Sequence, residues 1–263
     1  MTDVRDKSAG IEGDFAIDAT LPPTPGRDGG EGGTEGPLSD LRWLTRTGLD
    51  LLSLSSEREI IDYAGRALAE RLGDCITVVL TSTAGGRALT IRGIFGLDKR
   101  LLVRAVDLVG DRILDRSCPI DERFESVYRD RRLYRHEAGL VDFSKQALPK
   151  PVARALGQLL GVRDVYTMGL VGEERVIGNI HLLGLRPDLV DSPETVEVFA
   201  HQVALALEHA AAHEALRESE VRYRGLFENA VSGFALHDVI LDDQGNPVDY
   251  VFREVNAAFE EMT

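Results

Sequence analysis

Four segments rich in apolar and β-branched residues restrict the fold most, because they occur as two pairs that are each joined by a short turn. Residues 75–83 and 88–96 are separated by Ala-Gly-Gly-Arg, and residues 165–172 and 175–184 are separated by Glu173-Glu174. Each pair predicts an antiparallel hairpin. Helical periodicity flanks both pairs, so we expect an α+β fold in which helices surround an antiparallel sheet.

Helices are predicted before, between and after the two hairpins. Ser39 or Asp40 is expected to cap the first helix, and Ser55 or Ser56, with Glu59, the second. The other expected helices cover 98–109, 151–160 and about 192–218, whereas 112–150 has no clear pattern. In the last helix, apolar residues recur every three or four positions, which suits packing on a sheet first and on a partner helix later.

Charge and composition limit the classes of protein to consider. The 263 residues carry a formal net charge of −14, so nucleic acid is not an expected partner. The densest basic cluster, Arg129, Arg131, Arg132 and Arg135, is interpreted as a solvated face, with an anion site as the alternative. Because no apolar run is long enough to span a membrane and no signal peptide is recognisable, we expect a cytoplasmic protein without a membrane partner.

The two ends of the chain differ from its centre. Residues 1–37 contain eight acidic and three basic residues together with many Gly and Pro, which predicts a disordered acidic tail. Residues 223–263 read as a short helix, two strands joined by Asp-Asp-Gln-Gly-Asn-Pro, and the start of another helix. An isolated hairpin is marginally stable in water, so this segment is interpreted as part of a truncated domain.

These patterns resemble two sensory families. Residues 38–212 resemble a GAF domain in LTIRGIFGLD, MGLVGEERVIGNIHLLG and FAHQVALALEHA, the last being similar to the dimer-forming final helix of such domains. Residues 223–263 resemble the N-terminal part of a PAS domain, in Phe227-Glu228-Asn229, GFALHD and the Val255–Phe259 helix start. Residues 213–222 are then a linker helix.

The resemblance implies the sensory input region of a signal-transduction protein. A GAF domain followed by a PAS domain is typical of sensor histidine kinases, and a diguanylate cyclase is the alternative parent. Such folds often hold a small ligand between the sheet and a lid. The expected relay is a homodimer joined through the 192–219 helix, whose small residues Ala204, Ala206 and Ala210–Ala212 would let two copies slide. A ligand-free dimerisation scaffold is a further alternative.

Candidate site residues are chosen from alternate positions on the central strands and from the region expected to cover them. Phe95, Tyr166, Met168 and His181 are expected to line a pocket, with Cys118 on the lid side. Cys118-Pro119 also admits a haem-based sensor in which His136 or His181 is the opposite ligand. The Cys-His and Asp-Ile-Pro signatures of bilin attachment do not occur. His209 and His213 lack a third fixed ligand, so no metal site is predicted, and the sequence contains no catalytic constellation.

Overall fold

The chain divides into two compact units, which we describe separately in a computed structural model. The structure describes residues 16–18, 35–82, 88–110, 118–119, 122–144, 148–173 and 175–262. The first unit is Met1–Ala210 and the second is Ala211–Thr263. Among the described residues, no helix combines the length and the apolar character needed to cross a membrane.

The first unit is built on a sheet with long central strands and short outer strands. The central strands are antiparallel. Its strands are β1 (Ala16–Asp18), β2 (Cys75–Ser82), β3 (Ala88–Phe95), β4 (Cys118–Pro119), β5 (Tyr134–Arg135), β6 (Asp164–Val171) and β7 (Val176–Gly184). They are ordered β1-β3-β2-β7-β6-β5, and β4 pairs with β3. The two predicted hairpins are β2–β3 and β6–β7, and the predicted fold class is confirmed.

Within the described ranges, seven helices surround this sheet. They are α1 (Glu35–Leu52), α2 (Glu57–Leu72), α3 (Lys99–Val109), α4 (Glu122–Arg129), α5 (Gly139–Phe143), α6 (Lys150–Leu160) and α7 (Pro193–Glu228). Ser56 and Glu59 form the expected capping box of α2. The predicted cap of α1 is wrong, because that helix starts at Glu35 and Asp40 instead accepts hydrogen bonds from Arg71 and Thr195.

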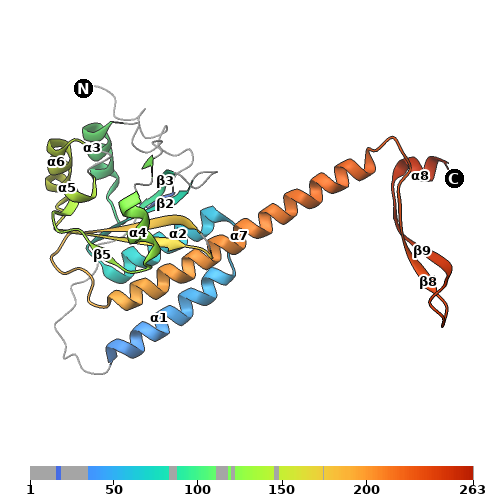
Figure 1. Ribbon diagram of the computed structural model, residues 1–263. Helices are drawn as coiled ribbons and strands as arrows, with labels where there is room; N and C mark the ends of the chain where they lie inside the picture. The colour runs from blue at the N-terminus through green and yellow to red at the C-terminus, as the bar shows by residue number, and fades with distance from the viewer. Residues whose placement is uncertain are drawn as a thin grey trace. The chain divides into compact units, whose positions relative to one another are not determined.

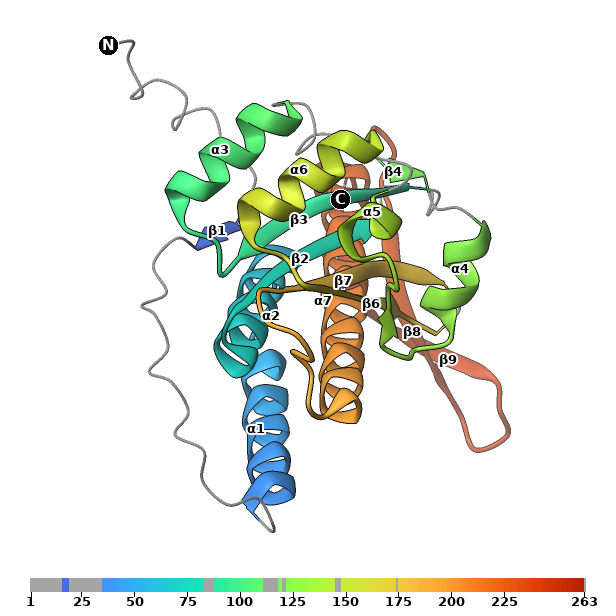
Figure 2. The same cartoon turned by 90° about the vertical axis from the view of Figure 1, so that its left-hand side faces the viewer.

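The helices form one layer on each face of the sheet (Figures 1 and 2). Helices α1 and α2 and the first half of α7 cover one face, where the core includes Phe95, Met168 and Phe199. Helices α3–α6 cover the opposite face, where a smaller core includes Leu102 and Val165. We call the second face the loop-side face. Strand alternation sends neighbouring residues of β6 and β7 into different layers.

Two segments differ from the sequence-based expectation. Helix α7 runs without interruption from Pro193 to Glu228, so the expected linker helix 213–222 is part of it. No proline interrupts this stretch, and Gly225 is tolerated near the helix end. Within the predicted tail, Ala16–Asp18 pairs in parallel with the edge of β3, because an edge strand offers free backbone groups. The other residues before Glu35 lie outside the described residues.

The second unit contains a hairpin and a short helix besides the end of α7. Strands β8 (Ala235–Leu241) and β9 (Pro247–Val255) are antiparallel, and α8 covers Ala257–Met262. Asn256 is fully buried and organises the unit. Its Oδ1 accepts from the backbone N–H groups of Phe234 and Phe259, and its Nδ2 donates to the carbonyls of Phe227 and Ser232. All four hydrogen-bonding positions of this amide are therefore used.

Candidate functional site

A buried polar cluster lies on the loop-side face and consists of His136, Thr167, Asn179 and His181. Thr167 and His181 are directly paired across β6 and β7, so both side chains point to the same face. His136 follows β5 and is held there because its backbone N–H donates to the carbonyl of Val165. The Thr167 hydroxyl lies 2.8 Å from Nε2 of His136 and 2.8 Å from Nδ1 of His181.

Burial determines the chemistry of this cluster. His181 is 2% exposed, and its desolvation, followed by the nearby His136, lowers its pKa from 6.5 to about 3. This imidazole is therefore neutral at physiological pH. Asn179 is 0% exposed, and neither Oδ1 nor Nδ2 has a hydrogen-bond partner within the described part of the chain. Each such orphaned group costs roughly 1–3 kcal/mol when no partner satisfies it.

Helices α4 and α5 cover the cluster. Phe143 of α5 packs against both imidazoles, with ring centroids 4.4 Å from His181 and 5.7 Å from His136. Asp142 Oδ2 lies 3.6 Å from Nδ1 of His136. Helix α4 lies directly on the sheet, since a Cβ atom at Gly169, the cross-strand partner of Asn179, would lie 2.3 Å from the Tyr128 carbonyl oxygen. The cluster is therefore closed off by two short helices.

The predicted site residues do not lie together. Phe95, Tyr166 and Met168 face the α1, α2 and α7 layer, where they belong to the main core. Of the four predicted site residues whose side chains the structure describes, only His181 points into the loop-side face. Cys118 lies in β4 opposite Leu89 of β3, and its side chain is outside the described residues. Alternation along β6 explains the separation, because Tyr166 and Met168 flank Thr167 and point away from it.

The structure does not test the haem alternative, because the side chain of Cys118 lies outside the described residues. His136 and His181 share one hydroxyl partner, and the Phe143 ring packs against both of them. Thr167 therefore engages Nε2 of His136 and Nδ1 of His181. Across the described ranges, no three His, Cys, Asp or Glu side chains are grouped to hold a metal ion. His209 and His213 accordingly lack a third ligand there.

The arginine cluster is exposed, as predicted, and its side chains also bind groups of the protein. We call residues 131–136 the strap, because this segment connects the sheet edge to α7. Leu133 donates its backbone N–H to Glu197 Oε1 over 2.9 Å, and Arg132 donates to Glu197 Oε2 over 3.0 Å. Arg131 donates to the carbonyl of Gly172. These arginines lie on the solvated face that the sequence predicts, and their hydrogen bonds go to groups of the protein.

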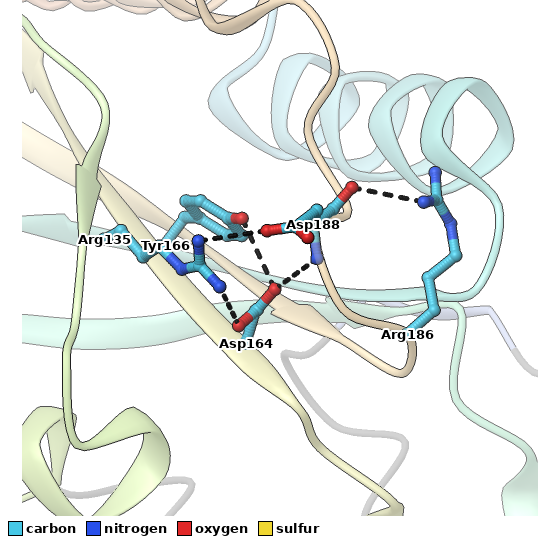
Figure 3. A network of polar contacts seen from close by, with 5 residues as sticks. All are labelled: Arg135, Asp164, Tyr166, Arg186 and Asp188. Atoms are coloured by element: carbon cyan, nitrogen blue, oxygen red, sulfur yellow. Dashed lines mark hydrogen bonds and ion pairs between the residues drawn. The ribbon is translucent and has the colours of Figure 1, made fainter.

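Arg135 extends the strap to the loop that leads into α7 (Figure 3). Its guanidinium contacts Asp164 Oδ1 of β6 at 2.7 Å and Asp188 Oδ1 of the loop at 3.1 Å. Asp188 donates its backbone N–H to Asp164 Oδ2 over 2.7 Å and has φ +48, a conformation that this contact helps to hold. Burial, and then the charge of Asp164, raises the pKa of the Tyr166 hydroxyl beside this network.

Sequence reasoning named His136 and His181 as candidates but missed Thr167 and Asn179 and the grouping of all four. Thr167 and Asn179 are polar residues inside strands that are otherwise apolar, and this contrast was the available signal. His136 lies in the stretch with no clear periodicity, and its partner Thr167 is 31 residues away. The strap gave no local signal, because Glu197 follows Leu133 by 64 residues.

Comparisons with known proteins relate the chain to solved structures alone. Neither a protein-family model nor a curated protein sequence matches it. The GAF domain of an Acinetobacter phosphoenolpyruvate-protein phosphotransferase is 15% identical, with 66% of this chain and 95% of that domain covered and a TM-score of 0.48. A GAF domain/HD domain protein from Geobacter sulfurreducens is 17% identical, with 62% and 98% covered and a TM-score of 0.45.

A longer structure gives the highest of the reported scores. The bacteriophytochrome RpBphP3 from R. palustris is 15% identical, with a TM-score of 0.51 and 77% of this chain covered. This chain spans 43% of that protein. At such identity the likeness concerns the fold, and it agrees with the α+β architecture described above.

Proposed function

We propose that this chain is the sensory input region of a cytoplasmic signal-transduction protein. In this proposal the first unit binds a small polar ligand at the buried polar cluster, and α7 carries the response. The GAF-like fold supports a regulatory role in general terms, since similar solved structures include a chemotaxis protein, phosphotransferase-system proteins and phytochromes. Fold alone does not name a ligand or an output.

Asn179 and His181 support a ligand at the cluster. A fully buried amide without partners keeps both its donor and its acceptor atoms available to a small polar molecule. His181 uses Nδ1 for Thr167, and among the described residues its Nε2 has no hydrogen-bond partner. A small polar molecule that satisfied these atoms would remove the cost of leaving them unpaired.

The strap is the observation that carries the proposal. His136 contacts the cluster, Arg135 contacts the loop before α7, and Leu133 and Arg132 contact α7 itself. Four residues within a segment of five therefore connect the cluster to the helix through hydrogen bonds. A ligand that moved His136 would shift an equilibrium between two arrangements of α7 only if it bound one of these arrangements more tightly than the other.

Hydrogen exchange on the full chain tests this connection without a known ligand. His136→Ala should increase exchange at the Asp188 amide and in the first turn of α7, while leaving α2 unchanged. The matched control is Ser144→Ala, which removes a buried hydroxyl on the same face that bonds within its own helix, to Leu140. Equal effects of both variants at Asp188, or no effect of either, would contradict the relay.

Native mass spectrometry tests the ligand itself. Protein purified from its own host should retain a small molecule, and the Asn179→Leu variant should lose it. A wild-type spectrum that shows bare protein under gentle conditions would favour the ligand-free dimerisation scaffold instead. The sensor would then respond through its partners and not through the cluster.

We further propose that the parent protein is a sensor histidine kinase, with the second unit as the start of a PAS domain and α7 as the dimer helix. The sequence resemblance of residues 223–263 supports the PAS assignment, and the exposed apolar side chains of α7 support pairing with a second copy. The coding sequence after Thr263 decides the output: a His-Glu-x-x-Thr-Pro segment would support the kinase, and a Gly-Gly-Asp-Glu-Phe segment would contradict it.

A further inference from the structure

A groove between α1 and α2 has the features of an anion site. It is partly open to solvent, has a volume of about 640 Å³ and is lined by Leu38, Ser39, Arg42, Trp43, Arg46 and Arg71. We propose that this groove binds a small phosphate ester. It lies in the helical layer on the face of the sheet opposite the buried polar cluster, so the proposal is independent of the function proposed above.

Two arginines of the groove are available for a ligand. Arg42 and Arg46 lie one turn apart on α1, so their side chains emerge on the same side of the helix. Both are exposed, and neither has a hydrogen bond or an ion pair with any residue that the structure describes. In a chain with a net charge of −14, two unpaired guanidinium groups at one concave surface create a local positive potential.

The remaining groups shape the groove. Arg71 is already paired with Asp40, and its guanidinium lies 5.8 Å from the centre of the Trp43 ring. Trp43 is fixed from inside by Phe199, at a centroid distance of 4.7 Å. The indole and Leu38 therefore form an apolar wall beside the two free guanidinium groups. A ligand with an anionic head and an organic body fits this division.

Phosphate suits the two arginines better than carboxylate does. One guanidinium fork satisfies both oxygens of a carboxylate, whereas a phosphate monoester offers three terminal oxygens that two guanidinium groups can share. The volume also exceeds that needed for a free ion and lies in the range of small-ligand sites. Phosphate monoesters are therefore the ligand class that we assign.

Fluorescence provides a direct assay, because Trp43 is the single tryptophan of the chain. Titration of the full chain with phenyl phosphate at low salt should change this fluorescence in a saturable way. The double variant Arg42→Gln/Arg46→Gln should bind at least about tenfold more weakly. The matched control, Arg58→Gln/Arg104→Gln, removes two exposed arginines elsewhere and should bind like the wild type.

Three results would overturn the proposal: no saturable change with the wild type, equal binding by the Arg42→Gln/Arg46→Gln variant, or succinate binding as tightly as phenyl phosphate. The last result would assign dicarboxylates instead. Circular dichroism checks that each variant is folded. Should the glutamine variant unfold, Arg42→Lys/Arg46→Lys keeps both charges but loses the forked donors, and its binding should still be weaker.

Discussion

At the scale of single residues, the hydroxyl of Thr167 fixes the direction of hydrogen bonding in the cluster. It has one hydrogen and two imidazole partners, so it donates to one histidine and accepts from the other. The carboxylate of Asp142 near Nδ1 of His136 favours a hydrogen on that nitrogen. Thr167 then donates to Nε2 of His136, and Nδ1 of His181 donates to Thr167. Nε2 of His181 is left as an acceptor for a ligand that donates.

The buried His181 makes stability depend on pH. Its pKa is about 3 in the folded chain but close to the ordinary 6.5 in the unfolded chain. Between these values the unfolded state binds a proton that the folded state does not, so the free energy of unfolding falls as the pH decreases below about 6.5. The slope contributed is about 1 kcal/mol per pH unit.

Urea unfolding measured between pH 6 and pH 5 checks this dependence. His181→Gln should reduce the slope by about 1 kcal/mol per pH unit. His213→Gln, which replaces an exposed histidine of α7, should leave it unchanged. Because His136 and Asp142 face the same site, the comparison between variants, and not the absolute slope, is decisive. An unaltered slope in His181→Gln would mean that this imidazole takes up its proton while folded.

At the scale of elements, close packing of α2 on the sheet depends on one glycine. A Cβ atom at Gly65 would lie 2.0 Å from Cδ2 of the fully buried Phe95. At Gly157 in α6, the nearest atom to such a Cβ is Cδ2 of Leu140 at 3.7 Å, an ordinary contact. The same substitution should therefore have opposite effects in the two helices.

Gly65→Ala should destabilise the first unit by about 1–3 kcal/mol, because overpacking outweighs the gain in helix propensity. Gly157→Ala should stabilise it by about 0.5–1 kcal/mol through helix propensity alone. Thermal unfolding of the two variants beside the wild type measures both effects. Stabilisation by Gly65→Ala would show that Phe95 moves aside freely, and that the packing of α2 on β3 is looser than described.

Helices and hairpins could be predicted from the sequence where neighbouring residues specify them. The Ser56–Glu59 cap, the two hairpins and the start of α7 at Pro193 depend on neighbouring residues, so local patterns identify them. The contacts that hold the strap against β6, the loop before α7 and α7 itself join residues 29 to 70 positions apart, and no local pattern encodes them. For the same reason, the pocket residues chosen from the sequence were distributed over both faces of the sheet.

At the scale of the whole molecule, α7 has two apolar sides with different roles. Val196, Phe199 and Val203 are buried against the sheet. Val198 and Leu205, seven residues apart, are 47% and 52% exposed, and Leu216 and Tyr223, also seven apart, are 59% and 54% exposed. A spacing of seven is typical of helices that pair side by side. The alanines expected to form this seam are divided, because Ala204 and Ala210 are buried in the core.

The exposed side of α7 leads to a prediction about assembly. If two copies pair through this side, Leu205 is buried in the dimer, and a carboxylate there would be desolvated without a partner. Leu205→Glu should therefore weaken dimerisation at least about a hundredfold. Sedimentation velocity of the full chain over a range of concentrations measures this change. The control, Leu108→Glu, places the same charge at an exposed leucine of α3 and should leave the dimer intact.

The outcome also separates two explanations for the length of α7. Helices longer than about 25 residues rarely occur without a partner, because an isolated helix in water has no tertiary packing to stabilise it. If Leu205→Glu yields a monomer in which exchange is faster in α7 but not in α2, the partner helix stabilises α7. A monomeric wild type with a well-protected α7 would contradict the dimer and leave the helix to be stabilised by its own sequence.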